Sequence, residues 1–187
     1  MNILPDLLPG HWLLVVAPHA ANDLMMDLLA RLAHRGPVRI VDGGDRFRAH
    51  RIARALRRAA RGEIPDLYGA LQRIHLARAF TCYQMVTLLE ELAAPAKQDD
   101  PNIFPTLTLD LLTTFYDENI PLAESQRLLE ICIGHLSHLS SRGPLAVSVK
   151  PPRVVEERIA LVDQLADRAG EVIRLEALIP PPPQRLF

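Results

Sequence analysis

The chain has 187 residues, of which 49% are hydrophobic and 23% charged, with a formal net charge of −1. This length suits one domain around a single core, and the composition excludes a disordered chain, which would combine lower hydrophobicity with higher net charge. The small net charge argues against a general polyanion binder. The apolar runs are too short to cross a membrane, and no cationic segment precedes an early apolar stretch, so we expect neither a membrane span nor a secretion signal.

Apolar strand patterns alternate with helical patterns along the chain. In the first half, strands are expected at 11–17, 38–42 and 71–77, and helices at 23–35, 48–61 and 83–94. After a polar loop, strands are expected at 106–110, 145–150 and 171–176, and helices at 123–140 and 154–169. Strands rich in Val, Ile and Leu without polar alternation indicate a parallel sheet that is covered on both faces. The predicted fold class is α/β, with a mostly parallel sheet and helices on both faces in one domain over 1–179, followed by a proline-rich tail at 180–187.

The segment 13–33, LLVVAPHAANDLMMDLLARLA, has the strand, turn and helix in which a nucleotide-binding chain carries its phosphate loop. Such a loop needs Gly so that its amides close on the phosphates, a Lys for their charge, and a Ser or Thr for magnesium. Alignment with G-x-x-x-x-G-K-[ST] instead places Ala17 and Asn22 at the Gly positions, Asp23 at the Lys and Leu24 at the hydroxyl. The Asp23 carboxylate would face a polyphosphate, so we expect no nucleotide cofactor there.

Three further segments carry a family resemblance: VRIVDGGDRFRAHRI at 38–52, IHLARAFTCYQ at 74–84 and TLTLDLLTTFY at 106–116. They resemble, in order, the Y-I-D-T-E-G-T-F-R-P-E-R stretch, the A-R-A-F-N-x-x-x-Q segment and the Walker B strand of RecA-type recombinases, especially the archaeal RadA and eukaryotic branch. The likeness extends from Gly10 to Glu176 and places Asp110 at the magnesium-associated Asp. It implies a RecA-like P-loop NTPase core with a degenerate phosphate loop.

The departures from that family decide the expected activity. The resemblance implies a Glu that activates the attacking water after the second strand, where this chain has Gly44. With Asp23 at the Lys position as well, positioning and electrostatic stabilisation are both lost, and phosphoryl transfer depends on little else. Lys150 matches a polar sensor position and lies either in the crevice at the strand carboxyl ends or on the plain surface. Asp110 alone is no metal site, and its alternative role is to hydrogen-bond a neighbouring loop.

Seven arginines and no acidic residue lie between positions 46 and 61. Helical spacing predicts an arginine stripe opposite an apolar, core-facing stripe. The arginine stripe consists of Arg51, Arg54, Arg58 and Arg61. The apolar stripe consists of Ile52, Leu56 and Ala59. Guanidinium groups bind phosphates bidentately, which makes the arginine stripe a candidate nucleic-acid surface. The interpretation that we favour is a solvated outer helix, or one that is paired with acidic residues of a partner.

Other reactive residue types predict no catalytic or metal site. His135 and His138 share a helix at i, i+3 but lack a third ligand for zinc. Ser125, Ser137, Ser140 and Ser141 lie in helical or terminal contexts without a nucleophile-elbow turn. Cys82 and Cys132 are interpreted as buried small hydrophobes in a reducing cytoplasm. The prolines at 180–183 either form an extended left-handed helix that docks in an aromatic groove or belong to a frayed terminus.

These patterns support three hypotheses about function. The first is a catalytically inactive RecA-like subunit that binds or scaffolds other proteins. Its partner would be a RecA-like ATPase or a second copy of the chain, in DNA recombination, DNA repair or a related ATPase assembly. The second is an unconventional nucleotide-binding ATPase that uses Asp110 and Lys150. The third is a nucleic-acid binder that acts through the arginine stripe.

Overall fold

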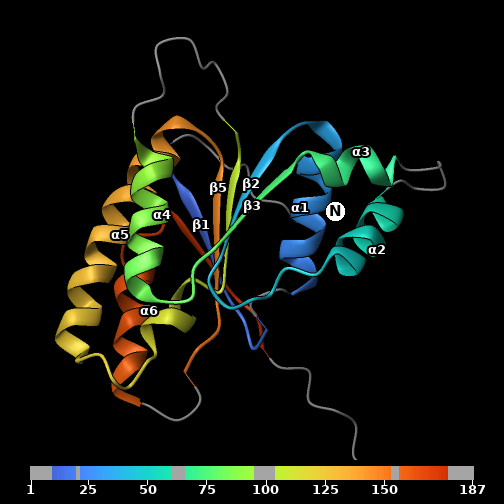
Figure 1. Cartoon of the computed structure of the whole chain (residues 1–187). Helices are drawn as coiled ribbons and strands as arrows, with labels where there is room; N and C mark the ends of the chain where they lie inside the picture. Colours follow the sequence, from blue (N-terminus) through green and yellow to red (C-terminus); the bar gives the residue numbers. More distant parts are fainter. Residues whose placement is uncertain (1–9, 20–21, 60–65, 95–103, 153–155, 177–187) are drawn as a thin grey trace, which may run out of the picture.

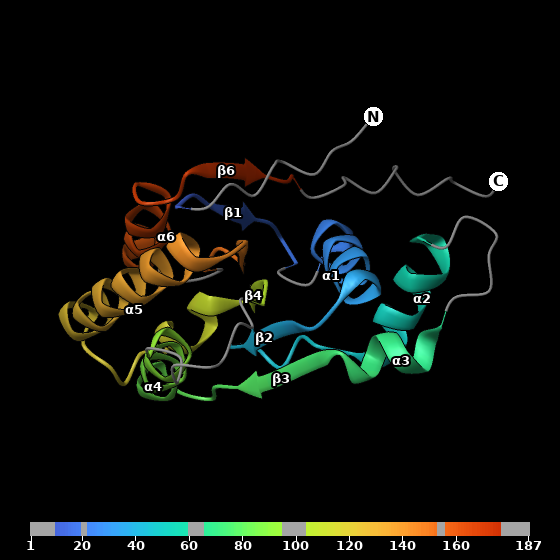
Figure 2. The ribbon, with the colours of Figure 1, turned by 90° about the horizontal axis from the view of Figure 1, so that it is seen from above.

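In a computed structural model of the chain, the described residues are 10–19, 22–59, 66–94, 104–152 and 156–176. They form a six-stranded parallel sheet in the order β3-β2-β4-β5-β1-β6 between two layers of helices (Figures 1 and 2). The strands are β1 (Trp12–Val16), β2 (Val38–Asp42), β3 (Ile74–Arg78), β4 (Thr106–Leu109), β5 (Leu145–Val149) and β6 (Glu171–Arg174). The helices are α1 (Asp23–Arg35), α2 (Ala49–Ala59), α3 (Leu67–Gln72), α4 (Cys82–Ala93), α5 (Leu122–Arg142) and α6 (Ile159–Ala166). Two 3-10 helices, η1 (Leu111–Phe115) and η2 (Glu156–Arg158), complete the described elements.

The predicted fold class is confirmed at the level of an α/β architecture with a parallel sheet and helices on both faces. Helices α1, α2 and α3 lie on one face of the sheet, and α4, α5 and α6 lie on the other (Figure 1). The segments 1–9, 177–179 and the proline-rich tail at 180–187 lie outside the described residues. None of the helices in the described ranges has the length and apolar character that a membrane crossing needs.

Each buried strand contributes side chains to two separate cores. In β1, Leu14 and Val16 pack with the α4–α6 layer, whereas Leu13 and Val15 pack with the α1–α3 layer. Successive side chains of a strand point to opposite faces, so a strand that is covered on both faces must be apolar throughout. This is why the WLLVV run of β1 has no polar alternation.

Three expected elements differ from the structure. A short helix, α3, which was not predicted, follows the N-cap Asp66 and overlaps the start of the expected third strand. That strand, β3, is therefore shifted and begins at Ile74 instead of residue 71. The expected helix at 154–169 is divided into η2 and the shorter α6, and residues 153–155 lie outside the described part of the chain.

Candidate functional site at the carboxyl edge of the sheet

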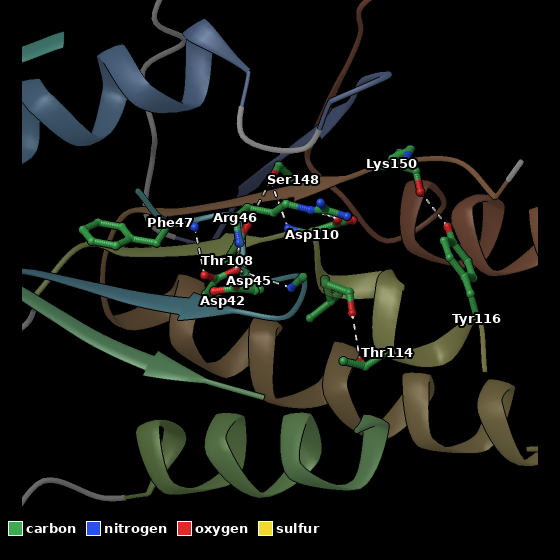
Figure 3. Close-up of polar contacts among 12 residues, drawn as sticks. Asp42, Asp45, Arg46, Phe47, Thr108, Asp110, Thr114, Tyr116, Ser148 and Lys150 are labelled. Carbon is green, nitrogen blue, oxygen red and sulfur yellow. Dashed lines mark hydrogen bonds and ion pairs between the residues drawn. The ribbon is translucent and has the colours of Figure 1, made fainter. Parts of the chain in front are cut away.

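The carboxyl ends of the parallel strands meet at one edge of the sheet, where open α/β folds bind ligands. Asp110, directly after β4, and Lys150, directly after β5, both lie at this edge, as the sequence predicted (Figure 3). The neighbouring strands β1 and β5 lead to helices on opposite faces, α1 and α6. Where the chain leaves two neighbouring strands toward opposite faces of the sheet, a crevice forms between their carboxyl ends. The space between β1 and β5 is therefore the expected place for a ligand.

Asp110 is fully buried and has left-handed backbone geometry, with φ of 55°. Its Oδ2 atom accepts a hydrogen bond of 2.7 Å from Nε of Arg46, in the loop after β2 (Figure 3). Its backbone N–H donates to the hydroxyl of Ser148, which donates in turn to the carbonyl of Thr108. Among the described residues, Asp110 Oδ1 and Thr108 Oγ1 are buried without a hydrogen-bond partner. The contacts of Asp110 match its alternative role, a strand-end residue that hydrogen-bonds a neighbouring loop.

The loop after β2 is held in shape by the buried Asp42. Its Oδ1 atom accepts hydrogen bonds from the backbone N–H groups of Gly44 and Arg46, at 3.3 and 2.8 Å. Its Oδ2 atom accepts one from the N–H of Phe47, at 2.9 Å. These bonds fold the loop back over the end of β2, and the side chain of Arg46 extends toward Asp110. The position of Arg46 is therefore set by a buried carboxylate on the adjacent strand.

A second carboxylate, Asp45, fixes the exposed side of the same loop. It has φ of 50° and lies 3.1 Å from the guanidinium of Arg48 and 3.5 Å from that of Arg78. The hydrogen bond from Arg48 is the main reason that the pKa of Asp45 is lowered. Both Asp and Asn tolerate left-handed backbone geometry, so an Asp suits this turn.

Gly44 allows the loop to lie directly against the Arg46–Asp110 pair. A Cβ atom at this position would come within 2.6 Å of Asp110 Oδ2 and 2.8 Å of Arg46 Nε. Real Cβ atoms do not approach polar atoms this closely, so one of the two side chains would have to move. Gly44 occupies the position at which the family resemblance requires a catalytic Glu, and the packing seen here leaves no room for that side chain.

The degenerate phosphate-loop positions have structural roles. Ala17 donates its backbone N–H to the carbonyl of Val149 at 3.0 Å and so extends the sheet. Asn22 caps α1, because its Oδ1 accepts from the N–H of Met25 at 3.0 Å. Leu24 packs against the α1–α3 core. The turn residues 20 and 21 lie outside the described part of the chain.

Asp23 begins α1, and its side chain is 82% exposed. Its carboxylate lies 3.8 Å from the guanidinium of Arg58 on α2. It also lines a hollow of about 360 Å³, together with Arg51 and Glu176. Two carboxylates therefore border the space in front of α1.

The arginine stripe on α2 is partly paired within the chain. Arg58 donates a 2.8 Å hydrogen bond to Asp27 on α1, which raises the pKa of Arg58. Arg54 is exposed, Arg51 is half-buried, and Arg61 lies outside the described residues. The favoured interpretation expected a solvated helix or acids from a partner, whereas the acids that pair with Arg58 belong to the neighbouring helix of the same chain.

The apolar stripe of α2 differs from its prediction at one end. Ile52 and Leu56 are buried as expected, and Ala55 is buried beside them. Ala59, predicted to face the core, is exposed at the last residue of α2. The prediction for Ala59 was therefore wrong.

Lys150 is half-buried and lines a hollow of about 490 Å³ at the crevice between β1 and β5. Its backbone carbonyl accepts a 2.9 Å hydrogen bond from the hydroxyl of Tyr116. Burial, with a further contribution from Asp110, raises the pKa of Tyr116 far above its usual value. Lining this hollow agrees with the crevice placement, one of the two that the sequence left open. His19 and Arg174 line the same hollow and were not singled out from the sequence, although His19 lies in the turn after β1 and Arg174 ends β6.

Cys82 and Cys132 are both free and fully buried, as predicted. His135 and His138 do not belong to a cluster, because the described residues contain no group of three or more His, Cys, Asp or Glu side chains arranged to hold a metal ion. The polar groups of the carboxyl edge are thus the main candidates for a functional site.

Comparison with known proteins does not assign this site. The chain matches no model of a known protein family. A search of curated proteins also finds no match. Function is therefore inferred below from the geometry and chemistry of the described residues.

Proposed function

We propose that this chain is a non-hydrolysing protein with a RecA-like core that acts as a binding or scaffolding subunit. Its partner would be a RecA-like ATPase or a second copy of the chain, in an assembly for DNA recombination or repair. The two buried free thiols suit a reducing compartment, so the proposed location is the cytoplasm. The proposal is supported by the contacts of the carboxyl edge and by an exposed edge of the sheet.

The ion pair between Arg46 and Asp110 is the observation that carries the proposal. A Walker B carboxylate assists phosphoryl transfer by way of a magnesium ion and substrate phosphates. Here one oxygen of Asp110 is 2.7 Å from a guanidinium, and that guanidinium belongs to a loop held by Asp42. An internal cation thus already neutralises the carboxylate. Gly44, which replaces the water-activating Glu, is the residue that makes this contact possible.

A surface for a protein partner lies along β3, which forms one edge of the sheet (Figure 2). Within the described residues β3 pairs only with β2. The backbone groups of Arg73 and Ala79 bond to β2, so the alternation of a parallel ladder directs those of Leu76 away from the sheet. Leu76 is 38% exposed, and beyond the strand Phe80 is 71% and Tyr83 51% exposed. We call Leu76, Phe80 and Tyr83 the β3 edge.

The β3 edge suits a partner that adds an extended segment to the sheet. Unpaired backbone groups of an edge strand bind another strand, and neighbouring side chains then provide specificity. Exposed aromatic residues are enriched at the centres of protein interfaces. A partner strand with apolar side chains could pair with the backbone of β3 and cover the exposed aromatic residues. Such a strand would come from a related ATPase or from another copy of this chain.

The experiment compares Phe80→Asp with the matched control Tyr68→Asp. Tyr68 is 75% exposed on α3, at the opposite end of β3, so both variants add a charge to an exposed aromatic site. The tagged chain is recovered from the cells that express it, and bound proteins are quantified by mass spectrometry. We expect Phe80→Asp to lose a partner that Tyr68→Asp and the wild type retain. Equal recovery with both variants would contradict the proposed surface.

Calorimetry with ATP and magnesium tests whether the chain is non-hydrolysing because it does not bind the nucleotide. The described carboxyl edge offers Asp23 where a phosphate-binding Lys would lie, and Asp110 is already paired. We expect no binding of ATP at micromolar concentrations. Micromolar binding would instead favour the unconventional ATPase, in which Asp110→Asn and Lys150→Gln should each weaken ATP binding.

A further inference from the structure

The hollow between β1, β5 and β6 is lined by cationic residues. It has a volume of about 490 Å³, which lies within the range of small-molecule sites. Lys150, Arg174 and His19 line it, and no carboxylate is among its described lining residues. Within the described part of the chain, neither Lys150 nor Arg174 takes part in an ion pair. A lysine and an arginine without a described acidic partner therefore border a hollow of ligand size.

The backbone around the hollow is fixed before any ligand enters. Ala17 bonds to the carbonyl of Val149, and Leu175 bonds to the carbonyl of Val16 at 2.8 Å. The carbonyl of Lys150 is held by Tyr116, and two prolines follow Lys150 directly. A residue before proline is restricted to extended geometry, so this segment has little conformational freedom to lose on binding.

The rest of the lining is apolar and comprises Val16, Ala17, Pro18, Pro151, Pro152 and Leu175. A fitting ligand needs an anionic group for the cations and a flat apolar body for these walls. Lysine binds phosphate as a point charge, whereas arginine binds two of its oxygens at once. Together they match a phosphate dianion better than a single negative charge.

The adjoining hollow limits how many phosphates the ligand can carry. Ala17, Pro18, His19 and Leu175 line both hollows, so the two lie side by side. The second hollow, of about 360 Å³, is bordered by the carboxylates of Asp23 and Glu176 and by the single guanidinium of Arg51. Further phosphates that entered it would meet more carboxylates than cations, and like charges at close range repel.

We propose that the hollow formed by Lys150, Arg174 and the neighbouring proline walls binds a small phosphate monoester with a flat apolar group. The inference is independent of the proposed partner at the β3 edge, because it concerns another edge of the sheet. It also differs from binding of ATP, since it requires neither magnesium nor a chain of phosphates.

Isothermal titration of the full chain with phenyl phosphate, inorganic phosphate and phenol tests this site. Lys150→Gln and Arg174→Gln each remove one charge from the hollow. The matched control is Arg35→Gln, which removes an exposed charge from the last turn of α1, at the amino edge of the sheet. Circular dichroism and thermal unfolding check that each variant keeps the fold.

We expect phenyl phosphate to bind more tightly than inorganic phosphate, and phenol not to bind. Each hollow variant should weaken phenyl phosphate binding by about tenfold, which corresponds to the loss of one charge-assisted contact, whereas Arg35→Gln should change it less than about twofold. The proposal is overturned if phenyl phosphate fails to bind at about 10 mM, a concentration that would still reveal very weak affinity. It is equally overturned if inorganic phosphate binds as tightly, or if all three variants bind alike.

Discussion

Replacement of Gly44 by alanine tests whether the Arg46–Asp110 pair depends on a missing side chain. Gly44 does not have a positive φ, so alanine can adopt its backbone geometry, and any cost must come from contacts. The new Cβ would lie 2.6 Å from Asp110 Oδ2, 2.9 Å from Asp110 Cβ and 2.8 Å from Arg46 Nε. Asp110 is fully buried and cannot move away, whereas the Arg46 side chain is 39% exposed and can.

The expected cost combines two effects. Forcing a methyl group into a packed site costs about 1–3 kcal/mol. Displacing Arg46 also removes a hydrogen bond from the buried Asp110 carboxylate. In a fully buried site this loss would add about 1–3 kcal/mol, and the cost is smaller here because solvent reaches the Arg46 side chain. We therefore expect Gly44→Ala to lower the free energy of unfolding by about 2–4 kcal/mol.

Urea unfolding, followed by the fluorescence of the buried Trp12, measures this change. The matched control is Gly134→Ala, on an exposed part of α5, where an added Cβ meets no atom within 4 Å. That variant should be stabilised by up to about 1 kcal/mol, because alanine favours helices. In a double-mutant cycle, Arg46→Met should relieve part of the Gly44→Ala cost. A Gly44→Ala protein as stable as the wild type would refute the reasoning.

Three further predictions concern other parts of the molecule. Arg158 is buried and donates hydrogen bonds to the carbonyls of Phe115 and Ile120 and to the Ser125 hydroxyl. Arg158→Met should therefore lower the free energy of unfolding in urea by about 2–4 kcal/mol. A loss below about 1 kcal/mol would show that these bonds contribute little to stability. Burial, and to a lesser degree Cys82, raises the pKa of Cys132 to about 12, whereas an unfolded thiol titrates near about 8.5. Above about pH 8.5 the Cys132 thiol loses its proton in the unfolded chain but keeps it in the folded chain, so the free energy of unfolding should fall as the pH rises. This fall with pH should be shallower in Cys132→Ala. Identical pH dependence in the two proteins would contradict the raised pKa of Cys132. If the arginine stripe binds nucleic acid, binding of a DNA duplex at low salt should weaken more in Arg54→Glu than in Arg58→Glu, because Arg58 is already paired with Asp27. The absence of salt-sensitive duplex binding at low ionic strength would exclude nucleic-acid binding by the stripe.

The layered fold could be predicted because its strands are apolar on both faces and its main helices have clear ends. The bounds of α1 match the prediction, since Asn22 caps its start and Gly36 follows its end. In contrast, α3 has only one buried residue, Ala70, and therefore gives almost no periodic signal. The edge strand β3 is mostly exposed, which explains why its start was misplaced.

The candidate site was only partly predictable for a different reason. The family resemblance singled out Asp110 and Lys150, and their positions at strand ends placed both at one edge of a parallel sheet. The partner of Asp110 is Arg46, which is 64 residues away along the chain, and no local pattern relates the two. The role of Gly44 likewise depends on a close approach between two strand-end loops, which only the three-dimensional packing reveals.

Amide hydrogen exchange on the chain within its native complex tests the proposed function most directly. The complex is purified from the cells that express the chain, and exchange is compared with that of the free chain. A partner strand on the β3 edge should slow exchange at the outward-facing amides of β3, including Leu76, and in the turn that contains Phe80. Unchanged exchange over residues 74–83, with slowing instead at the carboxyl edge when ATP and magnesium are added, would contradict a non-hydrolysing binding subunit.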